Sequence, residues 1–290
     1  MDTNELLKKV RQLEIKTRVL SNNVFAGEYH SAFKGRGMSF SEVREYQVGD
    51  DVRDIDWNVT ARFGRPHTKL FEEERELTAV LLVDVSGSLN YGAYNGVGRD
   101  MVSEIAATLA FSAIQNNDKI GVVFYSDRIE KYIPPKKGRK HILYIIRELL
   151  ELQPEGQGTD LGNALEFLVN TQKKACSVFV LSDFVGGSDF SKPMMVASRK
   201  HEMAAIQIYD RFMAELPNVG MIKVTDSESG EDLYVDSASR KVRQAHAKHW
   251  IDHEQKLKEM FRAQKVDFVS LTTEDDYVSA LRQLFDSRGR

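Results

Sequence analysis

The segment from residue 79 to residue 88 constrains the fold of this chain most. Residues 79–83 are all apolar, and the polar side chains of Asp84, Ser86 and Ser88 follow at alternate positions. A continuous apolar run of this length is typical of a strand that is buried on both faces of a parallel sheet. Open α/β sheets bind ligands beyond the carboxyl ends of such strands. One carboxylate and two hydroxyls on a glycine-containing turn at that point therefore predict a site for a divalent cation.

From residue 78 onward, the apolar patterns of strands and helices alternate. We expect strands at 78–84, 119–125, 128–133, 177–181, 204–209 and 266–271, and helices with apolar faces within 101–112, 142–150, 161–168 and 278–285. This alternation predicts an α/β fold with a doubly wound, mostly parallel sheet of the Rossmann type. Between the last two strands, a hairpin and a long polar helix predict an insertion at about 219–264.

Residues 1–77 have a different pattern, and we expect them to form a small N-terminal module. Leu6, Val10, Leu13, Thr17 and Leu20 are spaced alternately by four and three residues, which predicts an amphipathic helix that packs on the rest of the protein. Residues 24–77 are rich in aromatic and charged residues with interspersed glycines, a pattern typical of short strands and turns. The predicted domains are therefore 1–77, a helix plus a β-containing module, and 78–290.

The composition excludes several classes of protein. A formal net charge of −3 over 290 residues gives no support for a nucleic-acid partner or an anionic membrane surface. Cys176 is the single cysteine, which excludes an intrachain disulfide and a cysteine-based zinc site, and its apolar neighbours predict a buried core residue. No apolar run is long enough for a membrane span, and the polar N-terminus does not resemble a signal peptide. We therefore expect a cytoplasmic protein.

Two further oxygen-bearing side chains occupy positions that suit the same cation. Thr159 lies at the start of an expected helix, and Asp183 follows the expected strand 177–181. Magnesium takes oxygen ligands in near-octahedral geometry and usually keeps several waters. The predicted ligands are Asp84, Ser86, Ser88, Thr159 and Asp183, with Mg²⁺ as the expected ion and Ca²⁺ or Mn²⁺ as alternatives. The residue types alone also allow a simpler interpretation, because serine and aspartate favour capped turns and helix starts.

The order of these residues resembles the metal-ion-dependent adhesion site of von Willebrand factor A domains, and the resemblance covers residues 78–290. It implies that Ser86, Ser88 and Thr159 contact the metal directly. Asp84 and Asp183 would act largely through bound water, and an Asp or Glu carboxylate of a partner protein would complete the coordination shell. A site with few direct anionic ligands leaves the cation electrophilic and able to attract such a carboxylate.

The N-terminal part narrows the resemblance. Residues 35–57, with the sequence GRGMSFSEVREYQVGDDVRDIDW, are similar to the bacterial family numbered fifty-eight among the domains of unknown function. Members of that family typically accompany MoxR-type AAA+ ATPases and are thought to act with them as adaptors or chaperone-like factors. The resemblance implies a non-enzymatic, metal-dependent protein-binding role together with such an ATPase.

An enzymatic role for Ser86 is the main alternative. A nucleophile elbow requires Gly-x-Ser-x-Gly, but Asp84 and Ser88 occupy the two glycine positions, and no histidine is placed as an obvious base. The chain also has no Walker A motif, so we do not expect it to hydrolyse ATP by itself. A metal-dependent hydrolase or phosphatase and a structural scaffold with a vestigial metal site remain as alternative functions.

Two other clusters invite a metal-site interpretation. His246, His249 and His253 fall on one face of the expected polar helix, where a solvated face is a more common role than a zinc site. The acidic residues near position 50 do not fit a calcium-binding loop, so we interpret them as an ion-pair network with nearby arginines. These residues are Asp50, Asp51, Asp54 and Asp56, with Arg44, Arg53 and Arg62.

Overall fold

The computed structural model describes residues 10–14, 16–17, 39–72, 77–87, 97–156, 158–225 and 232–288. The chain divides into two compact units, one formed by Met1–Phe33 with Thr78–Arg290 and the other by Lys34–Leu77. This division has the predicted boundary before Thr78. It differs from the predicted grouping of residues 1–77, because the N-terminal helical residues cluster with the larger unit.

Side-chain contacts explain why the N-terminal helix clusters with the larger unit. Residues 10–14 and 16–17 are helical, and Thr17 is fully buried. The Lys16 ammonium lies 2.6 Å from the Glu104 carboxylate, and Arg139 Nε donates to Glu14 Oε1 at 2.9 Å. The helix therefore packs on the α/β unit, as its amphipathic spacing predicts, but the sequence periodicity did not indicate to which unit it belongs.

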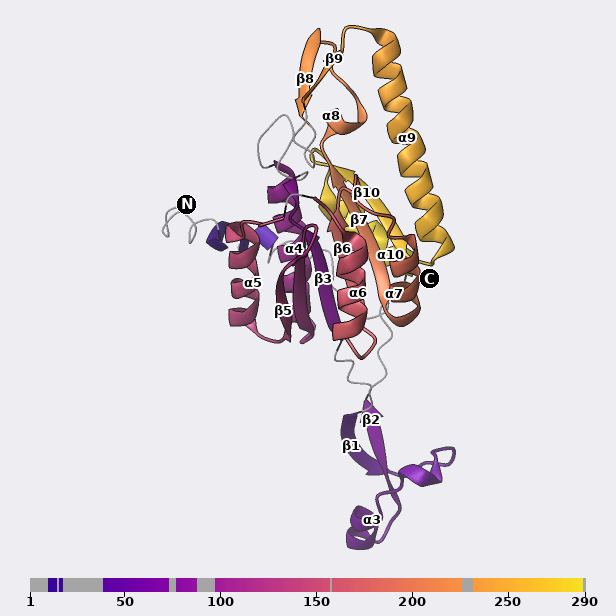
Figure 1. Cartoon of the computed structure of the whole chain (residues 1–290). Coiled ribbons are helices and arrows are strands. Elements are labelled where there is room, and N and C mark those ends of the chain that lie inside the picture. The colour runs from indigo at the N-terminus through magenta and orange to yellow at the C-terminus, as the bar shows by residue number, and fades with distance from the viewer. Residues whose placement is uncertain are drawn as a thin grey trace. The chain divides into compact units, whose positions relative to one another are not determined.

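One six-stranded sheet forms the centre of the described part of the larger unit, with the strand order β10-β7-β6-β3-β4-β5 (Figure 1). All neighbouring strands are parallel except β4 and β5, which form the predicted hairpin. The doubly wound, mostly parallel fold class is thus confirmed. The strands are β3 (Thr78–Asp84), β4 (Lys119–Tyr125), β5 (Ile129–Lys136), β6 (Ser177–Ser182), β7 (Glu202–Tyr209) and β10 (Asp267–Thr272).

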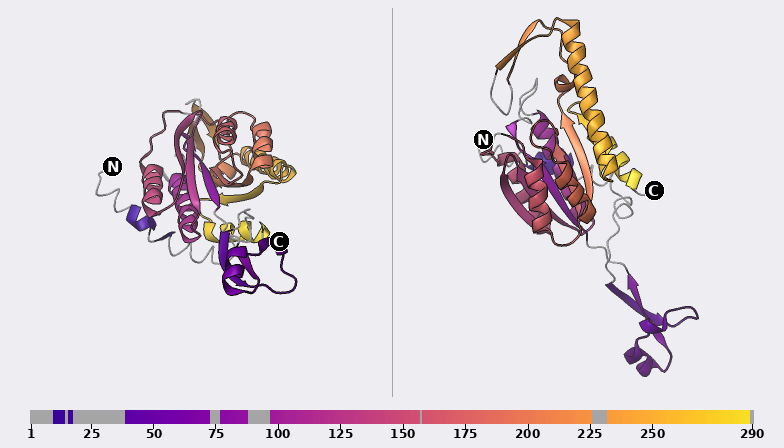
Figure 2. Two further views of the ribbon diagram at one scale, coloured as in Figure 1. Left: turned by 90° about the horizontal axis from the view of Figure 1, so that it is seen from below. Right: turned by 45° about the vertical axis from the view of Figure 1, so that its right-hand side comes forward.

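Helices cover both faces of this sheet, as the views in Figure 2 show. Val80 and Val178 point to a core shared with α6, α7 and α9, whereas the ring of Phe179 meets Phe285 of α10 on the opposite face, with ring centroids 6.0 Å apart. In the described residues, no helix has both the length and the apolar character of a membrane span. The bounds of the longer helices of this unit are α4 (Val97–Gln115), α5 (Arg139–Glu151), α6 (Leu161–Thr171), α7 (Ser191–Lys200), α9 (Arg240–Ala263) and α10 (Tyr277–Arg288).

The predicted apolar strand is the central element β3. Its residues from Ala79 to Asp84 are all buried, because β6 pairs with it on one side and β4 on the other. The chain passes from β3 to β4 on one side and later returns to β6 on the other side. The carboxyl ends of β3 and β6 therefore form the switch point of the doubly wound sheet, where such folds bind ligands.

Helix α7 is an element that the sequence patterns did not predict. It follows β6, begins at Ser191 and buries only Met194 and Ala197. Because only two of its ten residues have buried side chains, the sequence shows little of the apolar periodicity that predicts a helix.

The insertion between β7 and β10 contains the predicted hairpin and polar helix. It comprises α8 (Arg211–Ala214), β8 (Met221–Thr225), β9 (Asp232–Asp236) and α9. The 24 residues of α9 span about 36 Å at 1.5 Å per residue, whereas a six-residue strand such as β10 spans about 20 Å. Leu257 and Phe261, near the end of α9, pack in the core, and the first ten residues of the helix bury none of their side chains. The N-terminal half of α9 therefore extends past the sheet alongside the hairpin (Figures 1 and 2).

The smaller unit contains a two-stranded antiparallel sheet of β1 (Ser39–Glu45) and β2 (His67–Glu72), with the helical segments η1 (Val52–Asp54) and α3 (Trp57–Phe63) between them.

The acidic residues of the smaller unit have two roles. Asp50 pairs with Arg44 at 2.8 Å, as the ion-pair interpretation predicts. Asp51 and Asp56 cap η1 and α3 by accepting backbone hydrogen bonds, and Asp56 also pairs with Lys69, not with an arginine, at 3.5 Å. The prediction of a network is therefore only partly confirmed, because aspartate side chains also suit helix N-termini.

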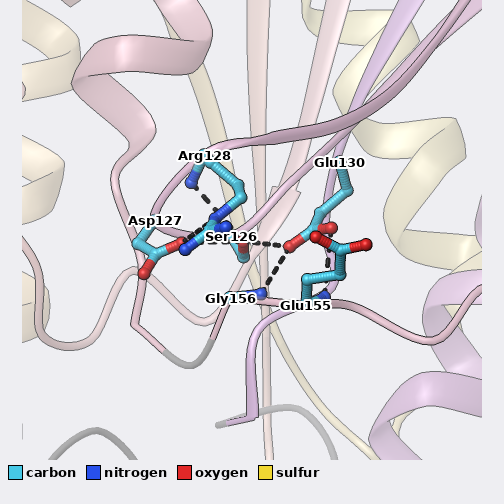
Figure 3. A network of polar contacts seen from close by, with 6 residues as sticks. All are labelled: Ser126, Asp127, Arg128, Glu130, Glu155 and Gly156. Carbon is cyan, nitrogen blue, oxygen red and sulfur yellow. Dashed lines mark hydrogen bonds and ion pairs between the residues drawn. The ribbon is translucent and has the colours of Figure 1, made fainter.

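A carboxylate of β5 fixes the loop that leads into α6 (Figure 3). Glu130 Oε1 accepts hydrogen bonds from Ser126 Oγ at 2.5 Å and from the Gly156 backbone at 2.8 Å, while Oε2 accepts one from the Glu155 backbone at 3.1 Å. A side chain at Gly156 would clash, since its Cβ would lie 2.0 Å from an Asp127 oxygen. Burial alone would raise the pKa of Glu130, but these hydrogen bonds outweigh it and lower the pKa. The ionised carboxylate thus holds the loop before Thr159.

The aromatic packing of α9 gives a test of the core. Phe261 is fully buried against Phe184 and Phe268, whereas Ile251 on the same helix is 62% exposed. We expect Phe261→Ala to lower the free energy of unfolding by about 3–5 kcal/mol and Ile251→Ala to change it by less than about 0.5 kcal/mol. Urea unfolding followed by circular dichroism measures both values. Equal effects of the two substitutions would contradict the described packing.

The Glu130 contacts predict a local and pH-dependent effect. In Glu130→Gln one of the two acceptor oxygens becomes an NH2 donor, so we expect at least one of the backbone amides of Glu155 and Gly156 to exchange about tenfold faster. Hydrogen exchange measured by mass spectrometry reports this, and Glu155→Gln is the control because it keeps the backbone donor.

The pH dependence of this effect follows from the lowered pKa of Glu130. A carboxylate with a lowered pKa stabilises the fold fully above its ordinary range, and this stabilisation is lost as the pH falls through the lowered value. The wild-type protection of the two amides should therefore fall to that of the Gln variant in acid. Protection that stays constant on acidification would contradict the role given to the charge.

Candidate metal centre

Asp84 connects the ends of the two central strands. It is the last residue of β3 and is 1% exposed. Its Oδ1 accepts a hydrogen bond from the Ser86 backbone at 2.9 Å, which shapes the turn after the strand. Its Oδ2 accepts one from Ser182 Oγ at 2.7 Å, and Ser182 is the last residue of β6. Asp84 therefore determines both the turn that carries Ser86 and the spacing of the two strand ends.

Asp183 is placed by a strained turn. It is 1% exposed, its Oδ1 accepts from the Val185 backbone at 3.0 Å, and its carbonyl accepts from Gln207 Nε2 of β7 at 2.9 Å. The next residue, Phe184, has a φ of 55°, a left-handed conformation that is unfavourable for a bulky side chain. Its ring packs edge-on against Phe261 at 5.3 Å. The aromatic core thus holds the turn that follows Asp183.

Thr159 is held at the same edge of the sheet through the backbone carbonyls of Tyr125, the last residue of β4, and Ser126, which follows it. The backbone of Val85, between Asp84 and Ser86, donates to the Tyr125 carbonyl at 2.9 Å. The backbone of Asp160, next to Thr159, donates to the Ser126 carbonyl at 2.8 Å, and the Asp160 side chain caps α6. The two segments are therefore anchored side by side on one short stretch of backbone.

The loop after Asp183 also lies against Thr159. Gly187 has a φ of 74°, and a Cβ there would lie 2.4 Å from the Thr159 carbonyl oxygen. Only glycine fits this close approach. Thr159, Ser182 and Gly187 line one shallow depression at the surface.

The Thr159 hydroxyl is a candidate oxygen ligand. Its Oγ1 is buried and has no hydrogen-bond partner among the described residues. A buried polar atom left without a partner costs about 1–3 kcal/mol, and the interaction is recovered when an ion or a water binds it. The hydroxyl is therefore available as an oxygen ligand for a cation.

The electrostatics of the strand ends favour a positive ion. Tyr125 is fully buried at the end of β4, opposite Asp84 in the parallel register. Burial raises the pKa of its hydroxyl well above the usual value, and the negative charges of Asp84 and Asp183 raise it further. The side chain of Tyr125 thus experiences the combined negative potential of both carboxylates.

The structure brings four of the five predicted ligands to one edge of the sheet: Asp84, Ser86, Thr159 and Asp183. Ser88 lies outside the described residues. Sequence reasoning did not identify Ser182 and Tyr125 as neighbours of Asp84. The strand register would have indicated Tyr125, because it stands opposite Asp84 in β4.

Other candidate centres are not supported. In the described part of the chain, no group of three or more His, Cys, Asp or Glu side chains is arranged to hold a metal, so His246, His249 and His253 do not form such a group. A site at the strand ends would depend on hydroxyl oxygens for part of its ligand set.

Cys176 is buried, as predicted, and lies 3.2 Å from His201 Nδ1. Burial raises the pKa of the Cys176 thiol to about 12 and lowers the pKa of His201 to about 4. Both groups are neutral at neutral pH, the reverse of what a reactive thiolate–imidazolium pair needs.

The chain was compared with known proteins by sequence and by structure. It is 29% identical to the uncharacterised protein Rv1480 of Mycobacterium tuberculosis, and equally to the uncharacterised protein Mb1516 of Mycobacterium bovis; each match covers 100% of this chain and 92% of the relative.

Among solved structures, the protein BatB from Bacteroides thetaiotaomicron has 14% identity and a TM-score of 0.49, covering 73% of this chain and 98% of BatB. The SpRpn10 VWA domain has 12% identity and a TM-score of 0.37, covering 71% of this chain and 93% of that domain.

The family comparison covers most of the chain. The model of the family described as "Protein of unknown function DUF58" matches residues 42–256, which is more than half of the sequence and includes both compact units. The chain therefore belongs to the DUF58 family.

Proposed function

We propose that this protein is a non-enzymatic binding protein that holds a divalent cation, Mg²⁺ in the first instance, and uses it to capture an acidic side chain of a partner protein. The ligands would be Asp84, Ser86, Ser88, Thr159 and Asp183. The observation that carries the proposal is the buried Thr159 hydroxyl, which has no partner among the described residues and lies at the same strand ends as two buried carboxylates.

The contacts of Asp84 support an indirect role in holding the ion. Both of its oxygens accept hydrogen bonds from the protein, and its carboxylate can contact the ion through a water, because a carboxylate oxygen accepts more than one hydrogen bond. The neutral hydroxyls of Ser86, Ser88 and Thr159 would then be the direct ligands. A cation bound in this way keeps most of its positive charge and attracts a carboxylate from outside the protein.

The surroundings of Ser86 favour binding over catalysis. In the described part of the chain, the polar side chains around Ser86 are Asp84, Arg99 and Ser103, with no imidazole or amine that could serve as a base, and the Asp84 carboxylate accepts from the Ser86 backbone and from Ser182. A metal-dependent hydrolase or phosphatase is therefore the second candidate. A screen of phosphatase and esterase substrates in which Ser86→Ala abolishes a measurable wild-type activity would favour it.

The proposed partner is a MoxR-type AAA+ ATPase, on the basis of the family resemblance, and the proposed location is the cytoplasm, where such an ATPase has access to ATP. The protein would act as an adaptor or chaperone-like factor for it.

Metal binding is tested at Thr159. Because a buried hydroxyl without a partner among the described residues is unfavourable, Thr159→Val should raise the metal-free stability, by up to about 1–3 kcal/mol. The same variant should bind Mg²⁺ at least about tenfold more weakly in isothermal titration calorimetry, since a direct ligand is lost. Thr159→Ser keeps the hydroxyl and should bind like the wild type. Equal Mg²⁺ affinity of all three proteins, or binding by none, would refute the metal site.

Partner capture is tested at Asp183. We expect a MoxR-type ATPase to be retained by the immobilised wild type in Mg²⁺ but not in EDTA, and Asp183→Ala to lower this retention at least about tenfold. Asp189→Ala is the matched control, because Asp189 lies in the same loop and contacts only Ser191 among the hydrogen bonds described. Unchanged retention by Asp183→Ala would favour the structural scaffold with a vestigial site.

A further inference from the structure

A large pocket lies beside the candidate metal centre. Its volume is about 740 Å³, within the range of sites that bind drug-sized ligands. Most of its walls are apolar and come from the insertion between β7 and β10. The apolar side chains that line it are Val185, Phe212, Met213, Leu216, Pro217, Ile222, Val224 and Trp250.

The overhang of α9 creates this pocket. The helix is anchored on the sheet by Leu257, Phe261 and Trp250, whose ring lies 4.6 Å from that of Tyr209 at the end of β7, and the ten residues before Trp250 extend past the sheet. The hairpin of β8 and β9 and the short α8 stand opposite that part of the helix. Such a space remains open because no described element of the core fills it.

The pocket and the candidate metal centre share one loop. Val185 and Gly186, which line the pocket, follow directly after Asp183 and also line the depression that contains Thr159. The ring of Phe184, in the same loop, packs against Phe261 of α9 with ring centroids 5.3 Å apart. A polypeptide bound at the metal would therefore reach the pocket within a few residues, at about 3.3 Å per residue in an extended chain.

Two ring nitrogens at the pocket wall lack partners. Trp250 is 8% exposed, and its Nε1 is buried without a hydrogen-bond partner in the described part of the chain; the same is true of His253 Nε2. Both residues line the pocket, three positions apart on one face of α9. Such groups are usually paired with a ligand or an ordered water. The pocket wall therefore combines apolar surface with unsatisfied hydrogen-bonding capacity.

We propose that this pocket binds a short apolar stretch, preferably containing tyrosine, next to the acidic residue of the partner polypeptide that binds the metal. The proposal rests on the proposed function, in which an acidic residue of the partner binds the metal. The charged side chains of the lining support a neutral occupant, because Lys223 is paired with Asp232 at 2.7 Å and the Asp210 carboxylate caps α8 by accepting from the Phe212 backbone at 2.8 Å. A tyrosine suits the wall, since its ring is apolar and its hydroxyl can both donate and accept a hydrogen bond.

The two tryptophans of the chain make the pocket measurable. Trp57 lies in the smaller unit and is 67% exposed, so Trp57→Phe leaves Trp250, at the pocket, as the single tryptophan, whose emission can be excited selectively over that of tyrosine. In this background, alanine-based nonapeptides with one central glutamate are titrated in Mg²⁺. The two residues after the glutamate are both Tyr, both Leu, both Ala or both Lys.

The proposal predicts an order of affinities. The Tyr and Leu peptides should bind at least about tenfold more tightly than the Ala and Lys peptides, with Tyr the tightest, and should shift the Trp250 emission. Ile222→Asp, in the pocket wall, should remove this preference. Met221→Asp is the matched control, because the neighbouring Met221 is 67% exposed and does not line the pocket. Equal affinities of all four peptides, or an unchanged preference in Ile222→Asp, would overturn the proposal.

Additional measurements distinguish a failure of the pocket proposal from a failure of the proposed function. If calorimetry detects Mg²⁺ binding but the peptides do not discriminate, the pocket assignment fails and the proposed function stands. If Mg²⁺ does not bind, the proposed function fails, and with it the joint site. Peptide binding that is equally tight in EDTA would overturn the link between pocket and metal. A response to dodecanoate but to none of the peptides would overturn the assignment of a polypeptide as occupant.

Discussion

The hydrogen bond from Ser182 Oγ to Asp84 Oδ2 is the interaction on which the candidate site depends. It connects the last residues of β6 and β3, the two strands at the switch point of the sheet. The other oxygen of Asp84 accepts from the Ser86 backbone, so one carboxylate fixes the strand spacing and the turn at once. Because Asp84 is buried, its charge has little access to solvent, and charged hydrogen bonds in such surroundings are strong.

The arrangement has a stability cost that indicates a function. A core built for stability alone would have apolar residues where β3 and β6 end, since buried carboxylates are unfavourable, as is a buried threonine hydroxyl that has no partner among the described residues. Phe184 adds a left-handed backbone conformation beside them. Strain and buried polar groups that persist together in one small region are typical of binding sites. The surrounding aromatic contacts of Phe184 and Phe261 hold the region in place.

Much of this fold was predictable from the sequence, because its strands are short apolar runs and most of its helices have clear apolar faces. The central strand, the hairpin of β4 and β5 and the insertion all follow from such local patterns. Helix α7 did not, since it buries only Met194 and Ala197. The grouping of the N-terminal helix also required the structure, because contacts such as Lys16 with Glu104 join residues far apart in the chain.

The candidate site was predictable to a similar extent. The residues Asp84, Ser86, Thr159 and Asp183 could be selected by type and position relative to strand ends. The role of Ser182 could not, because a serine at a strand end has many possible partners and only the strand order identifies Asp84 as the one it has. The pocket was not predictable from the sequence either, because its walls come from four segments that share no sequence motif.

Helix α9 joins the core to the insertion through contacts at several points along its length. Leu257 and Phe261 pack in the core, and the ring of Trp250 lies 4.6 Å from that of Tyr209 at the end of β7. Nearer its start, Arg243 donates to the carbonyls of Ser237 and Ala238, which follow the hairpin. Both sets of contacts depend on the number of helical residues between them, because each residue turns the helix by about 100°. One residue inserted between Arg243 and Trp250 would therefore prevent the hairpin and the core from keeping their contacts with α9 at the same time.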